Sequence, residues 1–257
     1  MAEKAMDYNR LIDIAAQAGV IMLENGAETY RVEDTINRII SLSGLKDSSS
    51  IVIATAIVVS LAGPNMDAIT VVKRVTSRGT DLNKICQIND MSRQLCKGII
   101  TLEEAEEKIR QTRKGELYGP FSYHISIVGI TIIFTLLSGG WATDALCAAF
   151  IGLILSFVLE SSRHMRINSF FQNLASAATV ALLTTVLSCI LPFPVHSSYI
   201  IIGCIMPLVP GVYFTNGIRD ILYGDYTAAI ARITEAVVIA TAIAVGVGLG
   251  ISLSQFI

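Results

Sequence analysis

Residues 167–218 read INSFFQNLASAATVALLTTVLSCILPFPVHSSYIIIGCIMPLVPGVYFTNGI and contain no Asp, Glu, Lys or Arg. A transmembrane helix needs about 20 consecutive apolar residues, so this run has room for two membrane crossings. The Pro192-Phe193-Pro194 sequence divides the run, because proline ends or kinks a helix. The stretch therefore predicts a membrane protein with helices over about 170–191 and 197–213.

Three further crossings are predicted on either side of this run. Residues 121–138 are uncharged, residues 141–159 carry only Asp144 near their start, and residues 229–254 carry Arg232 and Glu235 near theirs. Each segment is apolar enough and close enough to the required length to cross a bilayer. We therefore expect an α-helical polytopic membrane protein with about five transmembrane helices.

Charge is divided unequally along the 257 residues. Residues 1–118 hold 31 charged side chains, whereas residues 119–257 hold only 9. This division excludes a single water-soluble domain, a disordered protein and a secreted disulfide scaffold. The net charge of −2, without a basic block, gives no reason to expect a nucleic-acid partner. We expect two domains, a cytosolic domain over 1–118 and a transmembrane domain over 119–257.

The first 118 residues have the pattern of a small α+β domain. Apolar residues recur at helical spacing from Leu11 to Met22, and Asn25-Gly26 follows as a helix end. The charge-free segment Ile51–Leu61 is too short to cross a membrane and is rich in β-branched residues, which favours a buried strand. The pattern predicts the order α-α-β-β-α-α. The first helix ends near Asn25-Gly26 and the second buries Val32, Ile36, Ile39 and Ile40, strands follow over 51–61 and 68–76, and the last two helices lie at about 81–97 and 101–114.

The loops between crossings predict the orientation in the membrane. Lys and Arg lie before the first crossing, between the second and third at Arg163 and Arg166, and between the fourth and fifth at Arg219 and Arg232. The loops at 139–143 and 192–198 carry none. Positive residues concentrate on the cytoplasmic side, and the N-terminus lacks a signal-peptide pattern. We therefore expect a cell-membrane protein with a cytoplasmic N-terminal domain and its C-terminus outside.

Residues 205–235, IMPLVPGVYFTNGIRDILYGDYTAAIARITE, hold the candidate substrate and proton pathway. Pro207 and Pro210 each lack a backbone donor, and Gly211 loosens the chain, so the fourth helix is expected to break here. A broken membrane helix exposes backbone groups that hold small polar substrates. The polar and ionisable candidates on this segment are Asn216, Arg219, Asp220, Arg232 and Glu235.

Simpler interpretations of these charges remain open. Arg219, Asp220 and Asp225 suit an ordinary cytosolic loop, and Arg232 with Glu235 at i and i+3 suits a structural pair on one helix face. Asp144 is either a member of the pathway or a cap of the second transmembrane helix.

Catalytic, metal and cofactor chemistry has little support in the sequence. Residues 1–118 contain no histidine, no Gly-rich phosphate loop and no Ser/His/Asp set. The five cysteines have no CxxC spacing, and three lie in apolar runs where thiols pack as small hydrophobes. We expect no enzymatic activity, no metal and no cofactor.

Several stretches, in register along essentially the whole chain, resemble the threonine/serine exporter family, in particular its split form of a longer and a shorter subunit. They are Asn25-Gly26-Ala27-Glu28-Thr29-Tyr30-Arg31-Val32-Glu33, Gly139-Gly140-Trp141 with Asp144, Leu208-Val209-Pro210-Gly211 with Asn216 and Asp220, Gly224-Asp225, Ala231-Arg232 and Glu235-Ala236. Arg219 has no assured match, so its role rests on local chemistry alone.

The resemblance implies an exporter of small polar metabolites that the proton motive force drives, with a short multipass membrane protein as partner. Threonine and serine are the first expectation for the substrate, and a dicarboxylate such as succinate is the alternative. A membrane-tethered hydrolase and a membrane-anchored sensor are the remaining alternatives.

Two hypotheses assign roles to the charged residues. Glu28, Arg31 and Glu33 either bind substrate before translocation or dock the cytosolic domain against the inner mouth of the pathway. Asp220 or Glu235 carries the coupled proton. An amino acid needs charges of both signs to replace its hydration, and the pairs Arg219/Asp220 and Arg232/Glu235 supply both.

Overall fold

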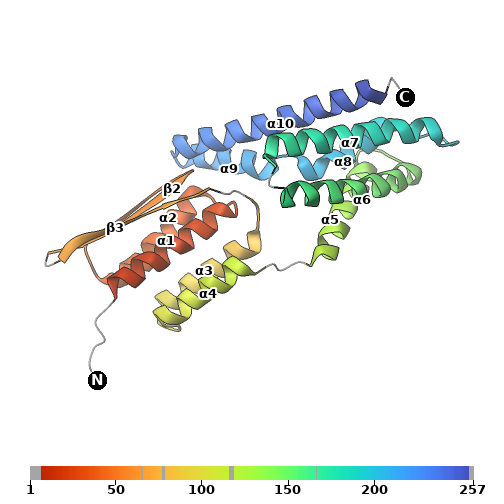
Figure 1. The fold of residues 1–257 in the computed structure, drawn as a ribbon. Helices are drawn as coiled ribbons and strands as arrows, with labels where there is room; N and C mark the ends of the chain where they lie inside the picture. Colours follow the sequence, from red (N-terminus) through yellow and green to blue (C-terminus); the bar gives the residue numbers. More distant parts are fainter. Residues whose placement is uncertain (1–6, 65, 77–78, 116–118, 166, 255–257) are drawn as a thin grey trace. The chain divides into compact units, whose positions relative to one another are not determined.

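The computed structural model describes residues 7–64, 66–76, 79–115, 119–165 and 167–254 (Figure 1). The contacts divide the chain into two compact units, and each is described by itself. The first unit is residues 1–115 with 212–234, and the second is residues 116–211 with 235–257. The division drawn from charge at residue 118 placed residues 212–234 with the membrane half, whereas their contacts group them with the first unit.

Four helices of the first unit lie in its N-terminal part. They are α1 (Tyr8–Glu24), α2 (Thr29–Ile40), α3 (Leu82–Cys96) and α4 (Leu102–Lys114), with a 3-10 turn η1 (Ser41–Ser43) after α2. Asp7 caps α1 by accepting the backbone N–H of Arg10. Thr101 and Glu104 form the predicted capping box of α4. The four predicted helices of this part are confirmed.

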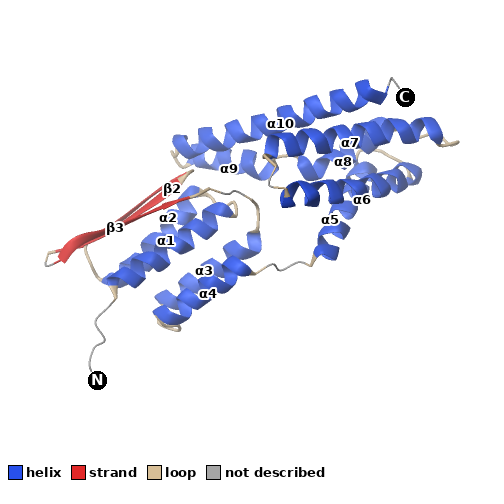
Figure 2. Cartoon of the chain, viewed as in Figure 1, coloured by secondary structure: helices blue, strands red, loops and turns tan. Residues whose placement is uncertain are grey.

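Three antiparallel strands form the sheet, in the order β1-β2-β3, and strands are drawn in red in Figure 2. They are β1 (Asp47–Ile53), β2 (Ala56–Gly63) and β3 (Met66–Arg74). The predicted single strand over 51–61 is wrong, because a two-residue turn at Ala54-Thr55 divides the segment between β1 and β2. The turn contains neither glycine nor proline, so the sequence gives no turn signal there. The order is therefore α-α-β-β-β-α-α; of the predicted turn between the last two strands, Asn65 lies outside the described residues.

The core of the first unit lies between the sheet and the α1–α2 pair. Ile57, Val59 and Leu61 alternate along β2 and are fully buried, as the period of a strand with one covered face requires. Gly19 of α1 allows close packing, because a Cβ there would lie 2.6 Å from a side-chain carbon of Ile36. Burying each large aliphatic side chain contributes about 1.5–3 kcal/mol, so this layer holds the α1–α2 turn in a fixed shape.

The rest of the chain is helical. Its helices are α5 (Pro120–Leu137), α6 (Ala142–His164), α7 (Ser169–Ile190), α8 (Ser197–Ile205), the 3-10 turn η2 (Met206–Leu208), α9 (Gly211–Leu222) and α10 (Tyr226–Ser254). Within the described residues, α6, α7 and α10 are long and apolar enough to cross a membrane, and α8–η2 with α9 qualify together as a fourth, bent span. The apolar helix over Phe121–Leu137 is shorter, so five crossings remain a prediction.

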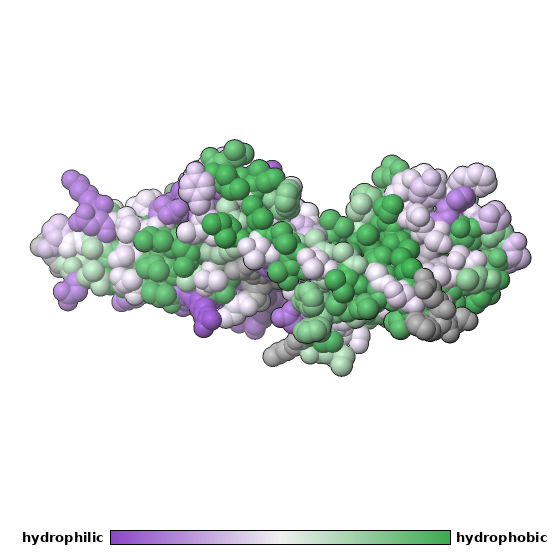
Figure 3. Space-filling model, turned by 90° about the horizontal axis from the view of Figure 1, so that it is seen from above, coloured by the Kyte–Doolittle hydropathy of each residue, from purple (hydrophilic) through white to green (hydrophobic). Residues whose placement is uncertain are grey.

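Large apolar side chains point outward from the membrane helices. Phe121, Leu146, Phe150 and Phe171 are all more than half exposed, and apolar residues cover much of the face seen in Figure 3. A soluble protein rarely exposes apolar surface so extensively, whereas a lipid-facing helix does. The surface therefore agrees with a helical membrane protein.

The predicted fourth crossing over 197–213 is not one continuous helix. The helical segment ends at Leu208, Val209 and Pro210 are not helical, and α9 then runs from Gly211 to Leu222. Proline lacks the N–H that a continuing helix needs, which explains a break at Pro210. The expectation of a broken fourth helix is confirmed, and its second half continues nine residues beyond the predicted end.

Candidate functional site

The candidate site is built on the turn between α1 and α2, within the first unit. Gly26 has a φ of +91°, in the left-handed region that glycine adopts without steric cost. Glu28 precedes the first residue of α2 and is only 5% exposed. The turn leaves the backbone carbonyls of Gly26 and Ala27 free of helical hydrogen bonds, so they are available as acceptors.

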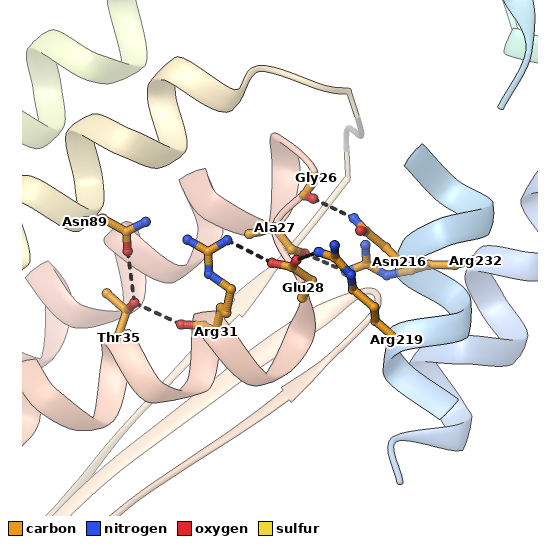
Figure 4. Close-up of polar contacts among 9 residues, drawn as sticks. All are labelled: Gly26, Ala27, Glu28, Arg31, Thr35, Asn89, Asn216, Arg219 and Arg232. Carbon is orange, nitrogen blue, oxygen red and sulfur yellow. Dashed lines mark hydrogen bonds and ion pairs between the residues drawn. The ribbon is translucent and has the colours of Figure 1, made fainter. Parts of the chain in front are cut away.

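Side chains from α9 and from residues 226–234 of α10 bind this turn (Figure 4). The amide of Asn216 donates to the carbonyl of Gly26 at 2.8 Å, and the guanidinium of Arg232 donates to the carbonyl of Ala27 at 2.7 Å. Arg219 forms an ion pair with Glu28. Three of the predicted site residues therefore contact the segment that carries the first family-like motif.

Asp220 and Arg232 form a buried ion pair beside the turn. Nε of Arg232 lies 2.9 Å from Oδ2 of Asp220, and the two residues are 8% and 1% exposed, respectively. The backbone N–H of Thr29 also interacts with the carboxylate of Asp220, whereas the buried hydroxyl of Thr29 has no hydrogen-bond partner among the described residues. A carboxylate has about four acceptor positions, so Asp220 can bind a proton or a donor group of a ligand beside these two contacts.

Glu28 stays ionised because its partners outweigh its burial. Burial alone raises the pKa of a carboxyl group, but a hydrogen bond from its own backbone N–H and the charges of Arg219 and Arg31 hold the pKa of Glu28 below its usual value. Nη1 of Arg31 lies 3.1 Å from Oε2 of Glu28. Glu28 therefore bridges two arginines.

Glu33 has the opposite electrostatic environment. It lies on α2 and is half-buried. Partial burial raises its pKa, and the negative charge of Asp225 adds to the effect. Glu33 is therefore easier to protonate than a solvent-exposed glutamate, and it does not share the arginine contacts of Glu28.

The contact between the turn and α9 is tight. The rings of Tyr30 and Tyr223 stack with centroids 4.0 Å apart. A cavity beside Gly26, Tyr213 and Arg232 has a volume of only about 20 Å³, which is the room that about one water molecule needs. An amino acid does not fit there unless the turn and α9 separate.

Arg232 forms an ion pair with Asp220 on α9, and Arg219 forms one with Glu28, the residue before α2. These pairs join elements that are distant in sequence, and the predicted pairing of Arg232 with Glu235 on one helix face stays a prediction. Glu235 lies on α10, and Pro210 and Gly211 lie at the break before and at the start of α9.

Asp144 lies in the second unit and is fully buried. Its carboxylate accepts the backbone N–H of Trp141 at 2.8 Å, which confirms the interpretation that it caps α6. It also accepts the backbone N–H of His196 at 2.8 Å and lies 3.0 Å from Nδ1 of the same histidine. Asp144 therefore ties the segment before α8 to the start of α6.

Sequence reasoning missed the partners of these residues. The acceptors at Gly26 and Ala27 are backbone carbonyls, which no sequence motif identifies. Tyr30 and Tyr223, whose rings stack, are far apart in the sequence, so local spacing gives no sign of their contact. Within the described ranges, no group of three or more His, Cys, Asp or Glu side chains is arranged to hold a metal.

Comparison with known proteins extends the resemblance to most of the chain. The family model ThrE, described as "Putative threonine/serine exporter", matches residues 13–254. The chain belongs to the threonine/serine exporter family. A protein of Mycobacterium tuberculosis named "Probable threonine/serine exporter" is 24% identical over 241 residues, which are 91% of this chain and 44% of that protein. The chain thus spans less than half of this relative's length. No solved structure matches it.

For this member of the threonine/serine exporter family, the match covers both the turn after α1 and the segment of α9 and α10 that binds it. The family is named for export rather than for an enzymatic reaction. Together with the apolar helices, the match makes the chain a membrane protein.

Proposed function

We propose that the chain forms part of a secondary-active exporter of threonine and serine that the proton motive force drives. Membership of the exporter family supports the transport role. The observation that carries the proposal is the Asp220–Arg232 ion pair, whose two residues are almost fully buried. An ionisable pair on a broken membrane helix and its neighbour is a default candidate for substrate or proton binding.

The charges around the turn favour an amino acid over a dicarboxylate. A zwitterion needs an anion for its ammonium group and a cation for its carboxylate, whereas a dicarboxylate needs mainly cations. The site offers Asp220 and Glu28 as anions, with Arg219 and Arg232 as cations. A dicarboxylate remains the alternative substrate, because each carboxylate of the site is already next to an arginine.

We infer that the α1–α2 turn acts as a gate at the inner mouth of the pathway. The cavity beside Arg232 holds about 20 Å³, so a substrate that reaches Asp220 must displace the turn or α9. Four polar or aromatic contacts of the described residues would then break: Asn216 to Gly26, Arg219 to Glu28, Arg232 to Ala27, and Tyr30 to Tyr223. Such contacts open at lower cost than a dry apolar interface of equal area.

Flux of threonine and of succinate, measured side by side in vesicles with an imposed pH gradient, tests the substrate and the coupling. Asp220→Asn is expected to abolish gradient-driven flux and to leave substrate exchange at equal pH intact, because exchange moves no net proton. Asp225→Asn is the matched control, since Asp225 lies five residues away and its carboxylate caps the start of α10. Normal gradient-driven flux in Asp220→Asn would remove it from the mechanism, and flux of succinate alone would overturn the amino-acid substrate.

A short multipass partner subunit is also part of the proposal. Transporters often pair two similar helical halves, and this chain supplies one block of apolar helices. The test is reconstitution of the chain alone and together with a co-purified membrane partner. Full transport by the chain alone would contradict the partner.

The exposed cysteines test the orientation. Cys86 and Cys96 lie on α3 and Cys189 near the end of α7, and all three are exposed. A cytoplasmic N-terminal domain predicts that a membrane-impermeant maleimide labels Cys86 in inverted vesicles, and Cys189 in intact cells. The reverse pattern, measured on single-cysteine variants, would invert the proposed topology.

A further inference from the structure

The second unit contains a polar cluster that the site at the α1–α2 turn does not include. His124 of α5 lies between two residues of α6, with Nδ1 2.7 Å from Oγ of Ser156 and Nε2 3.3 Å from Oε2 of Glu160. The ring of Phe157 lies 4.5 Å from the imidazole, centroid to centroid. Both imidazole nitrogens are therefore engaged, and the ring orientation is fixed by contacts on both sides.

The contact with Ser156 fixes the proton on Nδ1. The hydroxyl of Ser156 lies 2.6 Å from the backbone carbonyl of Leu153. A carbonyl oxygen only accepts, so the single hydroxyl proton of Ser156 points to Leu153. The serine oxygen is then an acceptor toward His124, and Nδ1 must carry the proton that it accepts.

The contact with Glu160 then requires one more proton. With Nδ1 protonated, a neutral His124 has a lone pair on Nε2, and an ionised Glu160 has only lone pairs on Oε2. Two lone pairs that face each other repel, so one proton must lie between them. The pair is either an imidazolium beside a carboxylate or a neutral imidazole beside a carboxylic acid, and both forms hold one proton.

The surroundings leave this proton exchangeable. The guanidinium of Arg163 lies over the ring of Tyr123, 5.2 Å from its centroid, and His164 contacts the backbone carbonyl of Glu160 at 3.0 Å. In the part of the chain that the structure describes, Glu160 has no ion pair with a lysine or arginine. Helices α7 and α8, which pack on α6, and η2, which packs on α5, carry no Asp, Glu, Lys, Arg or His. The side chains of His124 and Glu160 are 15% and 34% exposed, which gives the proton a route in and out.

The same geometry excludes a hydrolytic triad. Ser156 is fully buried, so no substrate reaches its oxygen. Its hydroxyl proton is directed at Leu153 rather than at the histidine, so His124 cannot act as its general base in this arrangement.

We propose that His124 and Glu160 form a proton-binding site between α5 and α6, positioned by Ser156, and that this site loads and releases a proton needed for export, in addition to the role proposed for Asp220. The proton-binding part rests on the geometry alone, whereas the coupling part rests on the proposed function. An apolar pair of similar volume would stabilise the contact between two apolar helices at least as well as an ionisable pair. The presence of an ionisable pair there therefore indicates a functional role.

The first test is spectroscopic and does not depend on transport. The full chain with ¹⁵N-labelled histidine, reconstituted in lipid, contains three imidazoles, at positions 124, 164 and 196. His124→Gln assigns the signal of the site. We expect Nδ1 to carry a proton, and Glu160→Gln to change the signal of Nε2, which either holds the shared proton or accepts it from the carboxyl group of Glu160. An Nδ1 without a proton, or a signal that Glu160→Gln leaves unchanged, would overturn the site.

The second test measures coupling in vesicles. We expect His124→Gln and Glu160→Gln each to reduce gradient-driven threonine flux by about tenfold or more, with exchange at equal pH retained. The double variant should be no worse than either single variant, because the two side chains share one proton. His164→Gln is the matched control, because His164 lies on α6, the helix of Glu160, and its Nδ1 contacts a backbone oxygen.

The outcomes separate the two proposals. If the unsubstituted chain, reconstituted together with its co-purified membrane partner, moves no threonine or serine while the ¹⁵N signals behave as expected, the proposed function fails and the proton site stands. If exchange falls together with driven flux at normal protein abundance, or if the two single effects multiply, the pair is structural and the coupling role is wrong.

Discussion

Replacement of Arg232 by methionine tests the contact between α10 and the α1–α2 turn. Methionine keeps the length and most of the apolar stem but removes the charge. Asp220, which is 1% exposed, then has a buried charge without its cation, and the carbonyl of Ala27 loses its donor. Breaking a buried pair by removal of one partner costs about 3–5 kcal/mol. At about 1.4 kcal/mol per factor of ten, the lower figure increases the opening equilibrium of the turn by roughly a hundredfold.

Hydrogen exchange of the backbone amides at residues 27–32 of the full chain measures this opening. We expect exchange in Arg232→Met to be roughly a hundredfold faster than in the unsubstituted protein. Arg74→Met, a change on an exposed strand end, is the control for loss of an arginine. The double variant Arg232→Met/Asp220→Leu should recover most of the protection, because it removes the uncompensated charge. Unchanged exchange in the single variant, or no recovery in the double variant, would refute the reasoning.

Three further predictions concern other parts of the chain. The pKa of Glu28 is lower in the folded protein than in the unfolded chain, so its stabilising effect is present at neutral pH and is lost as the pH falls through the lowered pKa. Amide exchange in the turn should therefore become faster at acidic pH, and Glu28→Gln should abolish that pH dependence. Thr101→Ala removes one half of the capping box of α4 and should cost about 1 kcal/mol in thermal unfolding, whereas Thr101→Ser should be close to neutral. Gly203→Ala should destabilise by about 1–3 kcal/mol, because its Cβ would lie 2.6 Å from the backbone nitrogen of Thr135; Gly129→Ala, which meets open space, should not, and equal effects would contradict the packing of α5 on α8.

Local patterns in the sequence predicted most of the elements. The spacing of apolar residues and the capping residues predicted α1 through α4. These signals are local, because the buried face and the ends of a helix are specified by residues within a few turns of one another. The two prolines predicted the break before α9. The turn at Ala54-Thr55 was missed because a hairpin inside an apolar run needs no glycine when tertiary packing supplies the energy.

The candidate site could be predicted only as a set of residues, not as a set of contacts. Asp220 and Arg232 were identified because an ionisable residue within an apolar membrane segment is energetically unfavourable. Such a residue can be recognised from the sequence as a functional candidate. Their partners were not, because pairs such as Arg219 with Glu28 depend on how distant elements pack. His124 gave no signal at all, since one histidine at the start of an apolar helix has no spacing that relates it to Glu160.

Asn216 and Arg232 bind main-chain oxygens rather than side chains, and this has an evolutionary consequence. A carbonyl oxygen is the same in every amino acid, so these two bonds place no chemical demand on the side chains of Gly26 and Ala27. The demand on Gly26 comes from its backbone angle, and the demand on Ala27 comes from the space around it. Substitutions at Gly26 and Ala27 are therefore compatible with these two hydrogen bonds as long as the backbone of the turn keeps its shape. Substitution of Asn216 or Arg232, in contrast, removes the donor. Sequence variation among relatives should therefore be greater at the two acceptor positions than at the two donor positions.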